Sequence, residues 1–352
     1  MKKVDCIVVG LGLAGIHLSF ELQKRNYSVH HIHANLPGES TSVAAGLINP
    51  ITGRRFVKSW MIEEVMPYAA DRYNELGQLL KSNYIDRMHI VRSFQTASDE
   101  NTWLAKTADS YLYQFLLEKA DMADTSESLQ LPELMGELKN CYRILTGELQ
   151  RDYISYLDTL DSISVEEFDF EALSIQPNIR YQEVEAKHIF FAEGWRVVKN
   201  PFFEIPAFSP TKGELLIVKA PSLKLTKAYK KDMFITPLGN DLYWCGATSE
   251  WNELTVDTSK KMQNRLVDFV TKTIKVPFEI IHRRTGIRPS SKNRKPVLGT
   301  HPEYSQLHIF NGMGTKGSSL APYFSSQLVD YIEGKVEIPH ELNVQRYFAK
   351  KG

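Results

Sequence analysis

A glycine-rich hexapeptide near the N-terminus has the spacing of a nucleotide-binding turn. The sequence reads Gly-Leu-Gly-Leu-Ala-Gly from position 10 to position 15. Gly10 permits a tight turn, Gly12 lets a pyrophosphate approach the backbone, and Gly15 allows a helix to pack closely on a strand. The free N–H groups at the start of that helix, together with its dipole, hold phosphate charge. This spacing therefore indicates dinucleotide binding, with NAD and FAD both open.

The flanking sequence supplies the elements that such a turn needs. Residues 4–9 form a short apolar run with β-branched residues, residues 16–24 have a helical pattern, and residues 29–32 form a second apolar run. We predict a strand, a glycine-rich turn, a helix and a second strand. In this context a G-x-G-x-x-G sequence indicates a dinucleotide site rather than a purely structural turn.

One position departs from the dinucleotide-binding pattern. An acidic residue that holds the ribose hydroxyls is expected at the end of the second strand, about 20 residues after the glycines. His33 stands there, and no aspartate or glutamate follows the strand before Glu39. An imidazole can hydrogen-bond a hydroxyl as donor or acceptor. His33 is therefore the first candidate for the ribose, and Asn35 is the second.

A second glycine-rich loop lies near the C-terminus. Residues 311–319 follow a strand predicted at residues 307–310 and precede a helix predicted at residues 320–332. Pro322 in the first turn and Gly334 after the last turn suit the two ends of that helix. Two loop-to-helix junctions can serve one extended ligand with two electron-rich parts. A nicotinamide enzyme does not usually need the second junction.

Length and composition restrict the class of protein. The chain has 352 residues, which predicts about two domains. Because the formal net charge is zero, nothing in the balance points to nucleic acid or a membrane surface as the main partner. The longest apolar stretch, residues 6–18, is too short to span a bilayer and lacks the layout of a signal peptide. We expect a cytoplasmic protein with no DNA partner and no membrane span.

The sequence contains no pattern for a metal site or a nucleophilic triad. Its cysteines, Cys6, Cys141 and Cys245, are odd in number, and their spacings match no metal motif. We expect free thiols and no bound metal.

Several ordered blocks resemble the D-amino-acid oxidase group of FAD-dependent oxidoreductases, which includes glycine oxidase and sarcosine oxidase. Besides the two glycine-rich loops, residues 41–48 resemble the stretch along the flavin, and residues 191–194 resemble a turn beside it. Residues 212–214 and 246–248 resemble strand motifs of the same family. The residues expected at the cofactor are Gly10, Gly12, Leu13, Ala14, Gly15, His33, Ala34, Ser42, Ala44, Ala45, Gly46, Leu47, Ala192, Gly194, Gly312, Met313, Gly314, Thr315, Lys316 and Gly317.

The resemblance also implies the residues that act on the substrate. Gly286-Ile287-Arg288-Pro289 is similar to the family's motif whose arginine grips the substrate carboxylate, and a guanidinium is a planar fork that matches two carboxylate oxygens. Lys316 and the helix start beside it would stabilise the anionic reduced flavin. Arg288 and Lys316 are thus the expected catalytic residues.

Other candidates for the substrate pocket are less constrained. Arg54, with Arg55 and Lys58, forms a group of cations that is typical of a solvated surface, but it would hold an anionic substrate if it faced a cleft. The family's substrate-binding tyrosines cannot be placed by motif. Trp244 is our candidate for an aromatic wall, with Tyr229 and Phe234 as further guesses.

One departure from the family concerns the attachment of the cofactor. Met313 lies in the loop where sarcosine oxidase carries a flavin-linking cysteine. No cysteine of this chain is near that position in the sequence. We therefore expect non-covalent FAD.

The expected fold is α/β, or mixed α+β, with a Rossmann-like FAD-binding domain and a second domain on a mixed, largely antiparallel sheet. The FAD-binding domain is expected to be discontinuous, at residues 1–58, 141–213 and 282–352. Residues 59–140 and 214–281 would form the substrate-binding domain. Within it, residues 99–138 are expected to be rich in helix.

The function that the resemblance implies is oxidation of the C–N bond of an amino acid or N-alkyl amino acid, such as glycine, sarcosine or a D-amino acid. A hydride would pass to flavin N5, and the imine would be hydrolysed. Alternatives are an oxidase of a larger amine such as a modified tRNA nucleoside side chain, a hydroxy-acid dehydrogenase, and a flavin-binding protein without turnover. The sequence leaves open the electron acceptor, oxygen or another, and the oligomeric state.

Overall fold

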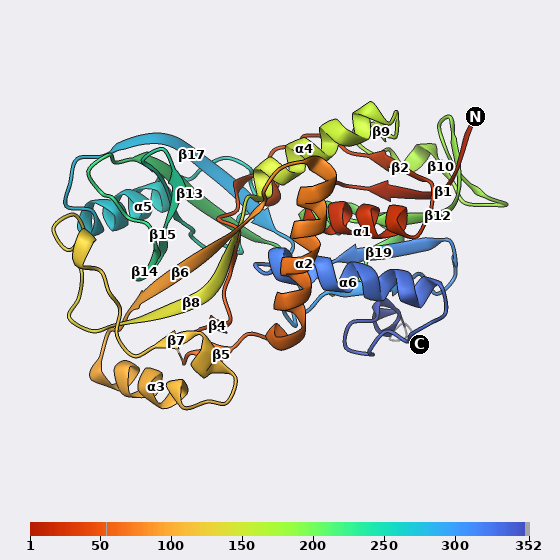
Figure 1. Cartoon of the computed structure of the whole chain (residues 1–352). Helices are drawn as coiled ribbons and strands as arrows, with labels where there is room; N and C mark the ends of the chain where they lie inside the picture. The colour runs from red at the N-terminus through yellow and green to blue at the C-terminus, as the bar shows by residue number, and fades with distance from the viewer. Residues whose placement is uncertain (54, 349–352) are drawn as a thin grey trace.

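The computed structural model describes residues 1–53 and 55–348, and these form two lobes, each built on one large sheet (Figure 1). An eight-stranded sheet lies in one lobe and a nine-stranded sheet in the other, counted over the described residues. The long helix α2 (Ile62–Leu80) stands between the lobes in Figure 1. The predicted mixed α/β fold is confirmed.

The eight-stranded sheet has a parallel core. Its central strand β1 (Lys2–Val9) pairs in parallel with β2 (Val29–Ile32) and β12 (Val184–Phe191), and β12 pairs in parallel with β19 (Leu307–Asn311). The other strands are β9 (Ile163–Ser164), β10 (Leu173–Ser174), β11 (Ile179–Tyr181) and β18 (Val297–Thr300). Because parallel strands end at the same edge, the loops after β1, β2, β12 and β19 gather there.

Two helices begin at that edge and pack side by side. Helix α1 (Leu13–Lys24) follows the first glycine-rich turn, and α6 (Gly317–Ile332) follows the second. Both begin about three residues earlier than the periodicity predicts, because glycines in the first turns hide the apolar pattern. Helix α4 (Thr146–Thr159) and α2 pack against the same core.

The nine-stranded sheet is mixed and largely antiparallel, as predicted. Its order is β17-β13-β16-β15-β14-β6-β8-β3, with β7 beside β8, and among the described strands of this sheet only β14 and β6 pair in parallel. The bounds are β3 (Leu47–Ile48), β6 (Ile85–Ser93), β7 (Leu116–Leu117), β8 (Met135–Ile144), β13 (Thr211–Lys219), β14 (Ala228–Lys230), β15 (Phe234–Gly239), β16 (Leu242–Gly246) and β17 (Glu279–Arg288). Helix α5 (Lys260–Thr273) packs on this sheet, and the short pair β4 (Ile51–Thr52) and β5 (Val57–Lys58) lies apart from it.

One segment differs from the prediction. Residues 99–138 were expected to be rich in helix, but α3 (Ala97–Thr107) is followed by short turns and β7. The expectation is wrong there because apolar residues such as Leu116 pair with β8 across the sheet rather than along a helix.

Strands β8, β13 and β17 run through the domain boundaries predicted near residues 141, 214 and 282. The division into domains stays a prediction. No helix among the described residues is long and apolar enough to cross a membrane.

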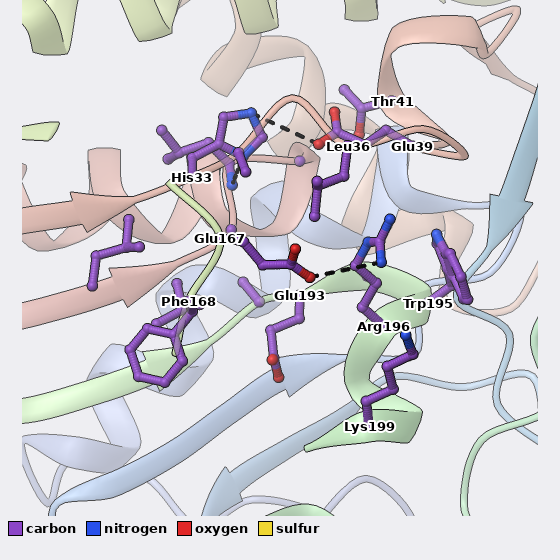
Figure 2. A pocket seen from close by; sticks show the side chains of 18 of the residues that line it. His33, Leu36, Glu39, Thr41, Glu167, Phe168, Glu193, Trp195, Arg196 and Lys199 are labelled. Carbon is purple, nitrogen blue, oxygen red and sulfur yellow. Dashed lines mark hydrogen bonds and ion pairs between the residues drawn. The ribbon is translucent and has the colours of Figure 1, made fainter. Parts of the chain in front are cut away.

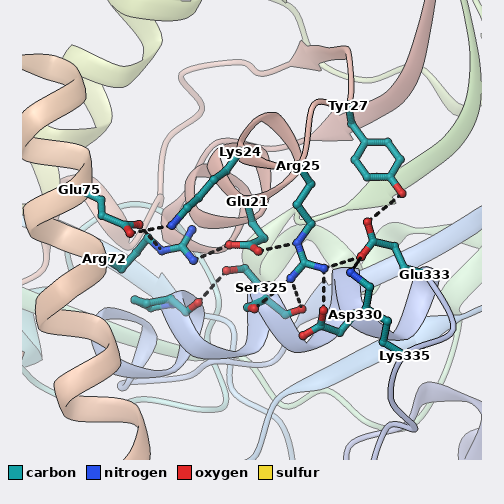
Figure 3. Close-up of polar contacts among 12 residues, drawn as sticks. Glu21, Lys24, Arg25, Tyr27, Arg72, Glu75, Ser325, Asp330, Glu333 and Lys335 are labelled. Carbon is teal, nitrogen blue, oxygen red and sulfur yellow. Dashed lines mark hydrogen bonds and ion pairs between the residues drawn. The ribbon is translucent and has the colours of Figure 1, made fainter.

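A polar network ties the helices of the first lobe together (Figure 3). At the end of α1, Arg25 donates from Nη1 to Asp330 of α6 and to Glu333 directly after α6, each at 2.6 Å, and from Nε to Glu21 at 2.7 Å. Arg72 of α2 donates to the other carboxylate oxygen of Glu21. Since the Arg25 side chain is only 18% exposed, water cannot replace these partners fully. The network therefore fixes α1 relative to α2 and α6.

We expect Arg25→Met to lower the free energy of unfolding by about 2 kcal/mol, because it removes the cation that three partly buried carboxylates share. Lys24→Met is the matched control. Its ion pair with Glu75 joins side chains that are 49% and 39% exposed, and such pairs contribute less than about 1 kcal/mol. Denaturant titration of both variants measures the difference, and equal losses would contradict the role given to Arg25.

Candidate active site

Two adjoining cavities lie where the carboxyl edge of the parallel sheet meets the antiparallel sheet. The larger has a volume of about 520 Å³ and the smaller about 140 Å³. Both are lined by Gly12, Ser40, Thr41, Ala192 and Gly194. The two cavities therefore form one elongated space that crosses the first glycine-rich turn.

The glycines of that turn have different surroundings. A Cβ on Gly15 would lie 1.8 Å from the carbonyl oxygen of Gly10, and Gly10 itself has a φ of +93°. A Cβ on Gly12 would meet only Thr41 Oγ1, at 3.1 Å. Gly10 and Gly15 thus permit the tight packing of α1 on β1, whereas a Cβ on Gly12 would press on the Thr41 hydroxyl and otherwise face the cavity. Thr41 Oγ1 also accepts a hydrogen bond from the Leu13 N–H at 3.1 Å.

The smaller cavity holds the residues around His33 (Figure 2). His33 Nδ1 accepts a hydrogen bond from the Leu11 N–H at 3.3 Å, so the other ring nitrogen, Nε2, carries the proton of the neutral ring. Burial lowers the pKa of His33 and favours that neutral form. Nε2 faces Glu39 Oε1 at 3.8 Å.

Glu39 brings a carboxylate to this cavity from the loop after β2. Its Oε2 accepts a hydrogen bond from Gln150 Nε2 at 3.1 Å, and the same Nε2 also donates to the Leu11 carbonyl oxygen at 2.9 Å. Burial raises the pKa of Glu39, and the bond from Gln150 opposes that effect. Gln150, on α4, therefore holds Glu39 against the glycine-rich turn.

The far wall of the smaller cavity carries opposite charges (Figure 2). Arg196 lies over the ring of Trp195, with 4.8 Å from guanidinium carbon to ring centre, and reaches Glu167 at 4.0 Å. Glu193 accepts a hydrogen bond from Asn200 at 2.8 Å, and burial raises its pKa to about 7.

The second glycine-rich loop and the end of β17 meet in the larger cavity. Lys316 lies directly before α6, and burial lowers its pKa. Arg288, the last residue of β17, donates to the Thr248 carbonyl oxygen at 3.2 Å, and burial lowers its pKa. A Cβ on Gly213 would lie 2.4 Å from Arg288 Nη2, so the glycine after Lys212 makes room for the guanidinium.

Most of the predicted residues share this space. The larger cavity is lined by Gly12, Leu13, Ala14, Ala44, Ala45, Gly46, Leu47, Ala192, Gly194, Trp244, Arg288, Met313, Gly314, Thr315, Lys316 and Gly317, and the smaller by Gly10, His33 and Ala34. Trp244 is held by a hydrogen bond of 2.8 Å from its Nε1 to the Val43 carbonyl oxygen.

Other predicted residues lie elsewhere. Gly15 and Gly312 line neither cavity and act in the backbone turns, and Ser42 is exposed and bonds to the Glu39 carbonyl oxygen at 3.4 Å. Arg54 lies outside the described residues. Its neighbours Arg55 and Lys58 are exposed. Of the two further aromatic guesses, Phe234 lines the larger cavity and Tyr229 is buried in the core of the sheet.

Sequence reasoning missed several polar residues of the site. Among them are Glu39, which lines the smaller cavity, and Lys230, which lines the larger. Glu39 was visible as the first acid after β2, but only the fold of the loop shows that it turns back to His33. Lys230 stands in a pair of lysines that resembles a surface turn, and only the pairing of β14 with its neighbours directs it inward.

A parallel sheet with two glycine-rich helix starts at one edge, and an antiparallel sheet that closes the space beyond it, defines a dinucleotide-dependent enzyme. The family model of FAD dependent oxidoreductases, DAO, matches residues 5–331. The chain belongs to this family, and it is an FAD-dependent oxidoreductase.

Known relatives agree with that assignment. The chain is 25% identical over 366 aligned positions to a glycine oxidase of Bacillus subtilis, covering 95% of this chain and 94% of the relative. Its fold is similar to the crystal structure of glycine oxidase from Geobacillus kaustophilus, with a TM-score of 0.80, 19% identity and coverage of 98% and 99%. It is also similar to iminodiacetate oxidase from Chelativorans sp. BNC1, with a TM-score of 0.77, 16% identity and coverage of 97% and 98%.

The site has the properties that FAD requires. The space beside Gly12 and the first turn of α1 accommodate an anion, and the elongated cavity reaches from there to the start of α6. None of the three cysteines lines either cavity, and all three are buried elsewhere.

Two glycine variants separate cofactor binding from folding. We expect Gly12→Ala to weaken FAD binding by at least about tenfold while the apoprotein keeps a melting temperature near that of the wild type, because the new methyl group occupies ligand space. Gly15→Ala is expected to lower the apoprotein melting temperature, because its Cβ collides with the backbone of Gly10. FAD titration and thermal unfolding measure both effects. Unchanged FAD affinity in Gly12→Ala would contradict the predicted phosphate site.

Proposed function

We propose that the enzyme oxidises the C–N bond of a small amino acid or N-alkyl amino acid. The observation that carries this proposal is Arg288, a half-buried guanidinium in the cavity that also contains the start of α6. The names of the relatives support it, because they include glycine oxidases and an iminodiacetate oxidase. A further structure of similar fold is an L-amino acid deaminase from Proteus vulgaris.

The proposed roles follow from the chemistry of the side chains. When bound, FAD accepts a hydride from the carbon that carries the amine. Arg288 grips the substrate carboxylate with two N–H groups and so orients that carbon. The nitrogen lone pair completes the C=N bond, the nitrogen releases a proton, and water hydrolyses the imine. Trp244 and Phe234 exclude water from the side of the reacting carbon.

Lys316 and the first turn of α6 are proposed to stabilise negative charge on the reduced cofactor rather than to bind the substrate. Both present positive charge or partial charge to the same end of the larger cavity. An anionic reduced cofactor is stabilised by such groups because they are fixed in place before the reaction.

The class of reaction is tested by anaerobic mixing of the holoenzyme with a panel of amino acids, N-alkyl amino acids and hydroxy acids. Bleaching of the flavin band by amines alone supports the proposal. Bleaching by hydroxy acids alone, or by no compound, would overturn it.

Replacement of Arg288 tests the carboxylate site. We expect Arg288→Leu to weaken the apparent affinity for an amino-acid substrate by about 2–5 kcal/mol, since it removes a charged hydrogen-bonding partner. Arg284→Leu, on the exposed part of the same strand, is the control and should leave the affinity unchanged. The measurement is the substrate dependence of anaerobic bleaching, and unchanged affinity in Arg288→Leu would rule out the clamp.

For the adenosine end of the cofactor we propose that His33 and Glu39 share the role of the missing acid. His33 Nδ1 is already engaged by the Leu11 N–H, so the ring positions the turn and has only Nε2 left for a ligand. Glu39 offers the carboxylate acceptor that ribose hydroxyls favour, and Gln150 aims it into the same cavity.

We expect Glu39→Gln to weaken FAD binding roughly tenfold or more, because a hydrogen bond to a charged acceptor is lost. FMN binding should not change, since FMN has no adenosine. Glu167→Gln is the control, because Glu167 lines the same cavity but is 67% exposed. Fluorescence titration of the apoprotein measures the FAD and FMN affinities of the wild type and of both variants. Equal losses for FAD and FMN would show that Glu39 acts on folding instead.

A further inference from the structure

The charged residues in the wall of the larger cavity all have one sign. Among its described lining residues are Lys230, Arg288 and Lys316, and there is no aspartate or glutamate. Under the proposed function, Lys316 serves the cofactor and Arg288 serves the substrate carboxylate. Lys230 has no task in that scheme.

Lys230 is built into the sheet rather than placed on its surface. It is the last residue of β14, where it pairs with Phe234 of β15 and with Arg92 of β6. Its Nζ lies 4.9 Å from the centre of the Phe234 ring and donates to the carbonyl oxygen of Asp232. No carboxylate among the described residues forms an ion pair with it. Its ammonium group therefore retains N–H donors for a ligand.

The neighbouring Arg92 makes this position more positive. Its guanidinium carbon lies 4.8 Å from the Phe56 ring centre, one terminal nitrogen donates to the Gly53 carbonyl oxygen at 3.1 Å, and its buried Nε has no hydrogen-bond partner within the described chain. Burial and then the charge of Arg92 lower the pKa of Lys230 to about 8, and the charge of Asp232 opposes this effect. Burial lowers that of Arg92 to about 10, and Asp99 opposes this effect. Burial and mutual repulsion disfavour the charged forms of these two side chains, and a bound anion would stabilise those charged forms.

We propose that Lys230 binds a second anionic group of the substrate, so that the enzyme acts on amino dicarboxylates. This inference rests on the proposed function, in which Arg288 holds the carboxylate next to the reacting carbon. Lys230 would then hold a carboxylate on the side chain or on the nitrogen substituent.

The two cations reach the cavity from strands on opposite sides of it. Lys230 is on β14 and Arg288 is on β17, with β15, β16 and β13 between them. Phe234 and Gly246, from the intervening strands, line the cavity as well. A single carboxylate held by Arg288 leaves Lys230 without an anion, whereas in the proposal a substrate with two separated carboxylates uses both cations.

Matched pairs of substrates test the inference. The holoenzyme is mixed anaerobically with aspartate and asparagine and with glutamate and glutamine, each as both enantiomers, and with iminodiacetate and its monoamide. We expect the acid of the preferred pair to bleach the flavin with an apparent affinity roughly tenfold or more above that of its amide, as for one charge-assisted hydrogen bond.

Variants then assign the preference to one side chain. Lys230→Met should remove the preference for the acid and leave the amide almost unaffected, and Lys230→Arg should retain it. Lys231→Met is the control, because the next residue is exposed and should keep the wild-type preference.

Each outcome decides between the two proposals. If neutral amino acids bleach the flavin but the acids have no advantage, or if Lys230→Met leaves the advantage intact, the dicarboxylate inference fails and the proposed function stands. If Lys230→Met slows bleaching by acids and amides equally, Lys230 acts as a base toward the amine, and the inference also fails. If no amino acid bleaches the flavin, the proposed function itself fails.

Discussion

The contact of helix α1 with the first glycine-rich turn sets the geometry of this enzyme. Gly15 and Gly10 approach so closely that any Cβ on Gly15 would overlap a carbonyl oxygen. Because this contact seats the start of α1 on the end of β1, the first turn of α1 lies at the carboxyl edge of the sheet. The ion pairs of Arg25 then fix α6 against α1 (Figure 3). One backbone contact thus determines the direction of both helix starts in the cavity.

Sequence patterns predicted the parts of the site whose chemistry is local. Glycine at positions 10, 12 and 15 has a backbone reason that any strand-turn-helix unit shares, and Arg288 lies in a compact motif. Because parallel strands end at the same edge of a sheet, the predicted strand arrangement alone places these distant loops together. The predicted mixed fold is correct for the same reason, since periodicity and turn residues report on each element separately. The starts of α1 and α6 were misplaced because glycine carries no apolar pattern.

Residues that depend on the path of a loop or on strand register escaped prediction. Glu39 lies six positions beyond His33 in the sequence, yet the loop returns it to within 3.8 Å of the ring. Lys230 faces a cavity only because β14 lies between β15 and β6. A shift of one residue in that pairing would place Lys231 inside instead. Residues 108–134 were misread because short strands and turns with apolar residues resemble helix by composition.

The charged side chains along the elongated space match the ligand groups that are proposed to bind beside them. Among the lining residues that the structure describes, carboxylates appear only at the end lined by His33, Glu39 and Glu167, where the proposed ligand groups are hydroxyls (Figure 2). The larger cavity has cations and no described carboxylate in its wall, and there each proposed ligand group is an anion. Burial makes an unpaired cation costly, so three such cations in one cavity indicate that anions complete it. A single substrate carboxylate and one anionic cofactor account for two of the three cations. Lys230 is then the buried cation for which neither ligand supplies an anion.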